Sequence, residues 1–547
     1  MLLILLSCVF LIPALAGWGN MLNFFLANPF NHLSGKVVYG IMGISILWTV
    51  LAFFIPLNAH VEIPTILTGL FFFFKNKEYK NLLYKESDNY LLFTCIIMVI
   101  LFCGSFYPFI LDHFGYYVPT IKWLMEFGIV KGIANLDLTL GQMSLWHIFQ
   151  AGFSNVCDPF LRINSVLLII YTLYVIENKS WIQLCFIPVL LLFSQSPSPD
   201  LPVIIFSLLI LNEILNGNRA TNQLFAFSVF VFAIKPTMIW LPALSFFYSF
   251  HINQSSVRSF LPGFLILILF FIKNIWTFGY PVFPIAVSDM GVHWKPNDEI
   301  LKISSQFAIQ KTYDMQYSYQ EISKFSAVDY IKNWLFLDGL KSFINISLII
   351  SLVIFIAFSF IKKNRVISLV CILIVLKSIL VILFSAQYRF FMDVFFIIFF
   401  ILFTDYFTKK RAVAVFSILS IIVAGFLVIP AVLQNYIPSF RLANFMGQMK
   451  KEQIYMPCHY ENQEYSQYKV GNLSFHVSKK YPYNFDTKLP AISESYIFDD
   501  VKAGIFPQMA DEKNIRKGFV WKTLNLKEKI EAQNVIHSIE NSYQQNK

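Results

Sequence analysis

The chain has 547 residues, of which 57% are hydrophobic and 14% are charged, whereas charged residues make up roughly 25% of a typical soluble protein. With a mean hydropathy of +0.61, a water-soluble globule of this size cannot bury all of its apolar surface. Composition therefore excludes a soluble enzyme, a disordered tail and a disulfide scaffold, and predicts a polytopic membrane protein in the lipid bilayer. The net charge of +10 is typical of loops that face anionic lipid, so no nucleic-acid partner is expected.

Apolar runs follow one another from the N-terminus to residue 430. A membrane span needs about 20 apolar residues, or fewer where a helix is short or broken. The first run, residues 1–17, ends like a signal-peptidase site, but no positive segment precedes its apolar core, so we interpret it as a span. About fourteen spans are expected by this criterion. They are 1–17, 37–57, 61–75, 90–110, 163–177, 181–195, 200–216, 222–234, 236–250, 259–276, 342–361, 366–384, 389–405 and 412–430, with 222–250 either one helix kinked at Pro236 or two short helices.

Short basic loops predict the orientation, because Lys and Arg stay on the cytoplasmic side of a membrane. The apolar segment 144–153 is too short to span and suits a helix that lies at the interface or re-enters the membrane. With this segment left out of the count, all the short basic loops fall on one face. The opposite, outer face then receives 111–162, the short loops 194–200 and 385–389, 277–341, and everything after residue 430.

The last part of the chain differs in composition from the rest. Residues 431–547 hold more than a third of all charged residues, and the Lys/Glu/Ile spacing of 525–545 is typical of a helix. The sequence therefore predicts two domains. Residues 1–430 form an all-α polytopic membrane domain with outer loops 111–162 and 277–341, and residues 431–547 form a small extracytoplasmic α+β domain.

Two carboxylates on the predicted outer face are candidate catalytic residues. Asp112 ends the span 90–110 and opens a long aromatic loop, and a carboxylate held there can act as a general base towards a hydroxyl. The alternative is that Asp112 is only a polar residue at a helix end. Asp200 follows the stiff turn Ser-Pro-Ser-Pro and starts the span 200–216, where capping of the helix is the alternative.

Further polar residues near the outer face are candidates for substrate binding. A cation in or at the edge of the membrane is energetically costly unless it binds an anion, which favours a role in substrate binding. The alternative is that the cation contacts only lipid phosphate. Lys122 and Glu126 are four residues apart, so a surface ion pair is their alternative. No metal-ligand spacing and no nucleotide-binding motif is present, and the sequence leaves open whether a divalent metal assists. The candidate substrate-binding residues are His113, Tyr116, Lys122, Glu126, Lys235, Lys273, Asn274 and Arg389.

This arrangement resembles the C-type (GT-C) superfamily of membrane glycosyltransferases. In that superfamily an acidic residue in the first large outer loop is followed by a juxtamembrane helix and by a second outer acidic residue, which Asp112, 144–153 and Asp200 match. Lys273-Asn274 before Gly279-Tyr280-Pro281 looks like an Arg-Asn and Gly-Tyr-Pro element of several bacterial members, with Lys in place of the bidentate Arg. The loop 116–146 also looks like an uncharacterised family of large bacterial multi-pass membrane proteins.

The resemblance implies an inverting glycosyltransferase of the bacterial inner (cytoplasmic) membrane. Such an enzyme moves a sugar from a polyprenyl-phosphate donor to a glycan, lipid or protein acceptor on the outer face. Asp112 would be the general base, and outer cations would stabilise the phosphate leaving group. Two alternatives stay open: an O-antigen-type polymerase or ligase, which relies more on outer arginines, and a transporter or flippase of lipid-linked sugars, which needs polar residues deep in several helices.

Overall fold

The computed structural model describes residues 1–30, 32–80, 87–436, 449–461, 464–479 and 481–545, and it is mostly helical. Within these residues six helices are long and apolar enough to cross a membrane. They confirm a helical membrane protein, while the expected count of fourteen spans goes beyond them. The six are α1 (Leu2–Leu22), α2 (His32–Ala52), Val257–Phe278, which comprises η8 (Val257–Phe260) and α13 (Leu261–Phe278), α17 (Leu340–Lys362), α18 (Arg365–Phe384) and α20 (Lys409–Val428).

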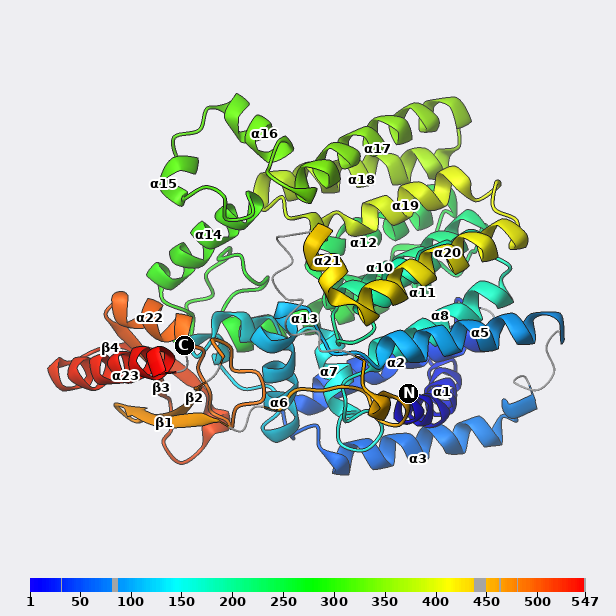
Figure 1. The fold of residues 1–547 in the computed structure, drawn as a ribbon. Coiled ribbons are helices and arrows are strands. Elements are labelled where there is room, and N and C mark those ends of the chain that lie inside the picture. The colour runs from blue at the N-terminus through cyan, green and yellow to red at the C-terminus, as the bar shows by residue number, and fades with distance from the viewer. Residues whose placement is uncertain (31, 81–86, 437–448, 462–463, 480, 546–547) are drawn as a thin grey trace.

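The remaining apolar runs also form helices, but shorter ones. The chain between 222 and 250 is two helices, because Lys235 before Pro236 adopts an extended conformation and ends the first helix. Figure 1 shows that many of the longer helices run roughly side by side. The shorter elements are α3 (Ala59–Lys75), α5 (Ser87–Gly104), α8 (Ile163–Glu177), η4 (Trp181–Phe186), α9 (Ile187–Leu190), η5 (Leu191–Phe193), α10 (Asp200–Leu215), α11 (Thr221–Ile234), η6 (Pro236–Met238), α12 (Trp240–Phe247), η7 (Tyr248–Ile252), α19 (Met392–Phe403) and α21 (Pro430–Tyr436).

The first three helices pack with their backbones close together. A Cβ atom added to Gly17 of α1 would lie 1.8 Å from the carbonyl oxygen of Gly69 of α3. One added to Gly40 of α2 would lie 2.0 Å from the carbonyl oxygen of Leu15. Small residues that allow such close approach favour helix association in lipid. Apolar side chains gain little there by exchanging lipid contacts for protein contacts, so close packing of the backbones matters more.

The segment expected to lie at the interface or to re-enter the membrane is a short helix inside the protein. α7 (Leu145–Gly152) begins after Ser144, whose hydroxyl accepts a hydrogen bond from the Trp146 backbone N–H, and all of its residues are buried. It packs against α2 and α6 (Val118–Glu126). A helix lying on the membrane surface would expose one face, so protein and not lipid surrounds this segment.

The C-terminal region contains two antiparallel two-stranded sheets. Their strands are β1 (Tyr465–Val470) with β2 (Leu473–Ser478), and β3 (Ile505–Met509) with β4 (Phe519–Thr523). The region also contains the helices α22 (Glu494–Lys502) and α23 (Leu526–Gln545) and the short turns η11 (Lys451–Ile454) and η12 (Ile515–Lys517), and α23 confirms the helix predicted at 525–545. In Figure 1 this region lies at the same end of the molecule as α6 and α14 (Asp298–Thr312), and α15 (Tyr319–Ile322) and α16 (Ala327–Leu335) continue from α14.

The C-terminal region docks on the loop that follows Asp112. The Phe519 backbone N–H donates to the Lys131 carbonyl at 3.0 Å. Gly132 next to it has a φ of +58°, and a Cβ there would lie 2.4 Å from the Phe519 carbonyl oxygen, so both its conformation and the close approach require glycine. The buried Asp137 accepts hydrogen bonds from Asn484 Nδ2 at 2.6 Å and from Ser493 Oγ at 3.0 Å. The loop and the C-terminal region therefore form one packed unit.

Candidate functional site

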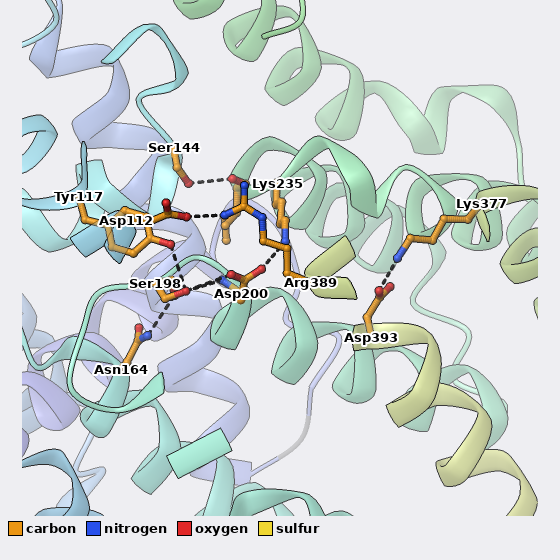
Figure 2. A network of polar contacts seen from close by, with 11 residues as sticks. Asp112, Tyr117, Ser144, Asn164, Ser198, Asp200, Lys235, Lys377, Arg389 and Asp393 are labelled. Carbon is orange, nitrogen blue, oxygen red and sulfur yellow. Dashed lines mark hydrogen bonds and ion pairs between the residues drawn. The ribbon is translucent and has the colours of Figure 1, made fainter. Parts of the chain in front are cut away.

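The two candidate carboxylates lie beside two of the candidate cations. The Arg389 guanidinium donates from Nη1 to Asp112 Oδ2, and the Lys235 ammonium pairs with Asp200 Oδ1 (Figure 2). Asp112 precedes η1 (His113–Tyr117), Asp200 starts α10, Lys235 follows α11, and Arg389 lies in η9 (Tyr388–Phe390). These four residues, called here the charge cluster, come from segments far apart in the sequence.

The two ion pairs of the charge cluster adjoin each other. The Lys235 ammonium lies 5.1 Å from the centre of the Phe390 ring, and the Arg389 guanidinium carbon lies at the same distance from the same ring. Both cations can thus use the negative face of one aromatic ring. Arg389 also lies close enough to Asp200 for the two charges to attract each other.

The two pairs differ in exposure. The side chains of Asp112 and Arg389 are 30% and 31% exposed, whereas those of Asp200 and Lys235 are each 11% exposed. A ligand can therefore reach the first pair more easily than the second.

Asp200 is held by residues from several other elements. Ser198 Oγ donates to Asp200 Oδ2 at 3.2 Å, and Tyr117 Oη donates to Ser198 Oγ at 3.4 Å. Asn164 Nδ2 of α8 donates to the Ser198 carbonyl at 3.0 Å. Helix α10 has Pro199 at its N-cap and shows no side-chain cap. Asp200 therefore does more than cap the start of a helix, since its carboxylate faces Lys235 and Ser198.

His113 and Tyr116 lie in the π-helical turn after Asp112. His113 is buried, and its Nδ1 lies 3.0 Å from Ser196 Oγ of the loop 194–200. Burial lowers the pKa of His113 well below its usual value, which keeps the ring neutral. Burial and then the Asp112 carboxylate raise the pKa of Tyr116. Tyr116 thus lies next to Asp112 as a neutral phenol, and His113 connects the loop 111–162 to the loop 194–200.

Lys122 and Glu126 do not join the charge cluster. Lys122 of α6 pairs with Asp486 of the C-terminal region, Nζ to Oδ1 at 2.8 Å, and also donates to the Thr487 carbonyl at 3.3 Å. Among the ion pairs of the described residues none joins Lys122 to Glu126, so the alternative of a surface ion pair between these two residues is wrong. Both residues lie where the C-terminal region docks, since the charges of Lys122 and Asp486 also act on Glu126.

Lys273 and Asn274 donate hydrogen bonds to backbone carbonyls and do not join the charge cluster. Lys273 is 1% exposed, and its ammonium donates to the carbonyls of Gln142 at 2.6 Å and Met143 at 3.1 Å. Asn274 Nδ2 donates to the Pro281 carbonyl at 2.7 Å, which folds the chain back after α13. These contacts show that the outer cation predicted at Lys273 faces neither lipid nor Arg389.

Three further charged residues were not selected from the sequence. Lys377 of α18 and Asp393 of α19 form a buried ion pair, and Asp393 also accepts a hydrogen bond from Trp240 Nε1 at 3.0 Å. Figure 2 shows this pair beside the charge cluster. Lys311 of α14 is exposed and lies where the charges of Arg389 and Asp112 act on it. The available signal was a charged residue inside an apolar run, as at Lys377 and Asp393.

The described residues contain no metal-binding cluster, and a cavity within them lies away from the charge cluster. No group of three or more His, Cys, Asp or Glu side chains in those parts of the chain can hold a metal ion. A cavity of about 340 Å³ lies between α1, α3 and the segment 156–160, and its walls are mostly apolar. Its lining includes none of the four residues of the charge cluster.

Fold and site together define a helical membrane protein in which a partly exposed cluster of carboxylates and cations lies among the ends of several helices. The chain belongs to a family described as a domain of unknown function (DUF8201), whose model matches residues 1–396. The match includes every member of the charge cluster and ends before α20 and the C-terminal region. No curated protein and no solved structure matches the chain.

Proposed function

We propose that the protein is an inverting membrane glycosyltransferase that moves a sugar from a polyprenyl-phosphate donor to an acceptor hydroxyl. The observation that supports this proposal is the meeting of Asp112, Asp200, Lys235 and Arg389 in one cluster. Glycosyl transfer from a lipid phosphate needs a base for the acceptor and positive charge for the leaving group, both beside the lipid. The resemblance to GT-C enzymes, through Asp112 and Asp200, points to the same chemistry.

The proposed reaction uses the partly exposed pair. Asp112 takes the proton of the acceptor hydroxyl as the hydroxyl oxygen forms a bond to the anomeric carbon from the face opposite the phosphate. The bond between the anomeric carbon and the phosphate oxygen breaks, and its electron pair leaves with the polyprenyl phosphate. Arg389, with Lys235 on the same Phe390 ring, stabilises the charge that develops on that phosphate. Asp200 holds Lys235 in place.

The proposal includes a topology of about fourteen spans by the hydropathy criterion, with 111–162, 277–341 and 431–547 outside the bacterial inner membrane. Val328 of α16 and Leu526 of α23 are 71% and 82% exposed, so cysteines placed there are suitable reporters. A membrane-impermeant maleimide should label both in intact cells, in a chain whose exposed Cys95 has been replaced. A cysteine at Lys410 should react only after the membrane is permeabilised. Labelling of Lys410→Cys alone in intact cells would reverse the topology and remove the proposed outer site.

The function is tested with the full-length protein in lipid nanodiscs and undecaprenyl monophosphate as the probe. We expect saturable binding that Arg389→Gln weakens by roughly tenfold or more, because a hydrogen bond to a charged group contributes about 1.5–3 kcal/mol. Lys295→Gln is the matched control, since Lys295 is a cation of the proposed outer loop 277–341 but pairs with Asp289 outside the charge cluster. A panel of undecaprenyl-phosphate hexoses then identifies the sugar by release of the phosphate. Equal binding by wild-type and Arg389→Gln protein would contradict the proposal.

A transporter of lipid-linked sugars is a second candidate, because one observation favours it. Lys377 and Asp393 form a charged pair within apolar helices, and such pairs commonly mark transport or proton pathways. Proteoliposomes separate the two candidates. A transporter moves a fluorescent undecaprenyl-phosphate sugar between leaflets and loses this activity in Asp393→Asn, whereas the glycosyltransferase releases polyprenyl phosphate without such movement.

A further inference from the structure

In the structure the proposed base, Asp112, and the proposed phosphate-binding residue, Arg389, are bound to each other. Arg389 donates to the carboxylate of Asp112. A carboxylate bound by a guanidinium has a lone pair engaged and cannot act freely as a base, and a guanidinium bound by a carboxylate has fewer donors for a phosphate. The proposed function needs both groups released, so something must separate them.

The other cation in the cluster cannot replace Arg389. Lys235 is held by Asp200 in a pair whose side chains are each 11% exposed, and Asp200 is itself fixed by Ser198. Breaking this pair would leave a largely enclosed charge without a partner, which is costly. The Asp112–Arg389 pair, about 30% exposed on each side, is the easier of the two to open.

Lys311 gives the region an excess of positive charge. Lys311 lies within electrostatic range of Arg389 and Asp112, and the salt bridges among the described residues include none of Lys311. Lys311 is exposed, so an anion that approaches from solvent or from the membrane surface meets it first. An anion held there is then in position to compete with Asp112 for Arg389.

We propose that Arg389 exchanges partners, leaving Asp112 for the donor phosphate, so that donor binding unmasks the catalytic base. This inference rests on the proposed function and adds an order to it: the donor binds first, and the acceptor hydroxyl loses its proton only afterwards. No covalent bond changes in the exchange, since one charge-assisted hydrogen bond of Arg389 replaces another. Without donor, Asp112 stays masked and the site does not activate a hydroxyl or water.

The exchange of partners by Arg389 predicts changes in donor affinity that a purely catalytic role of Asp112 does not predict. If Asp112 competes with the phosphate, then Asp112→Asn should bind undecaprenyl monophosphate more tightly than the wild type, by roughly three- to tenfold. Arg389→Gln should bind it roughly tenfold more weakly. In the double variant the gain from Asp112→Asn should vanish, because its effect acts through Arg389. Arg389→Lys, which keeps the charge but loses the fork of donors, should fall between the wild type and Arg389→Gln.

A matched control separates competition from general electrostatics. Asp200→Asn also removes one negative charge from the cluster, but its partner is Lys235. Any gain in affinity that it causes by electrostatics alone should persist in the Arg389→Gln background.

Lys311→Gln should reduce the association rate and its salt dependence more than it raises the dissociation rate. Equal thermal unfolding temperatures of the variants exclude misfolding as the cause.

The outcomes distinguish the inference from the proposed function. If Arg389→Gln weakens binding but Asp112→Asn does not strengthen it, the partner exchange is wrong and the proposed donor site stands. The same conclusion follows if the gain from Asp112→Asn persists in the Arg389→Gln background. If the wild-type protein does not bind the probe, the proposed function fails together with the inference.

Discussion

Two ion pairs on neighbouring segments show how differently the same chemistry is used in this protein. Arg389 and Asp393 are four residues apart, yet Arg389 pairs with Asp112 in a site about 30% exposed, while Asp393 pairs with Lys377 at 5% and 2% exposure. Trp240 also donates to Asp393. The first pair can exchange its partner for a ligand, whereas the second is enclosed by three helices. Charge within an apolar sequence therefore does not mark a ligand site unless the charged groups can be reached.

The largest effect is expected at Asp112. Asp112→Asn keeps the size of the side chain but removes the base, so sugar transfer should fall by about 10²- to 10⁴-fold. The protein should accumulate normally in the membrane. The measurement is release of polyprenyl phosphate from the donor identified by the hexose panel, with protein level as control. Near-normal turnover would return Asp112 to the role of a polar residue at a helix end.

The enclosed pair should affect stability instead. Lys377→Met leaves the Asp393 carboxylate buried without its cation, and removing one partner of a buried pair costs about 3–5 kcal/mol. The thermal unfolding temperature in detergent should therefore fall clearly. The double variant Lys377→Met/Asp393→Leu should recover much of this loss, because two apolar side chains need no partner. If the double variant stays folded but the protein loses its activity, the enclosed pair has a functional role, and exposure does not distinguish functional from structural ion pairs in this protein.

The helices could be predicted from hydropathy, because a run of apolar residues long enough for lipid forms a helix with its backbone satisfied internally. The members of the charge cluster could also be selected, since Asp112, Asp200 and Arg389 stand at the edges of such runs. Their pairing could not be predicted, because it depends on which helix ends meet. Lys273 shows the limit most clearly: its partners are backbone carbonyls more than a hundred residues away, and no side-chain pattern records them.

A third prediction compares two outer cations that looked alike in the sequence. Arg389→Ala should raise the KM for the lipid donor by roughly 10-fold or more, since a charge-assisted contact to phosphate is lost. Lys273→Ala removes hydrogen bonds to the carbonyls of Gln142 and Met143, so it should lower the unfolding temperature more than it changes donor KM. Donor titrations with both variants check this. A KM increase in Lys273→Ala as large as that in Arg389→Ala would place Lys273 at the phosphate after all.

The smallest effect concerns a buried carboxylate that has no cation beside it. Burial raises the pKa of Asp137 to about 7, although hydrogen bonds from Ser493 oppose the shift, and burial also raises the pKa of Asp500. Asp137 is therefore protonated more readily when the C-terminal region is docked than when it is released. Protonation of Asp137 therefore stabilises the docked state. This contribution is fully present below pH ~4, the usual range of a carboxyl group, and is lost as the pH rises through about 7.

Docking should accordingly be weaker at pH 8 than at pH 5, which limited proteolysis of the C-terminal region measures directly. Asp137→Asn cannot ionise and should reduce the pH dependence, as should Asp500→Asn, the second buried carboxyl group of the interface. Asp289→Asn is the control. Lys295 lowers the pKa of this exposed carboxyl group, so Asp289 does not change its protonation between pH 5 and pH 8. Equal or stronger protection at pH 8 in the wild type would mean that Asp137 stays ionised in the interface. Its hydrogen bonds from Asn484 and Ser493 would then outweigh burial.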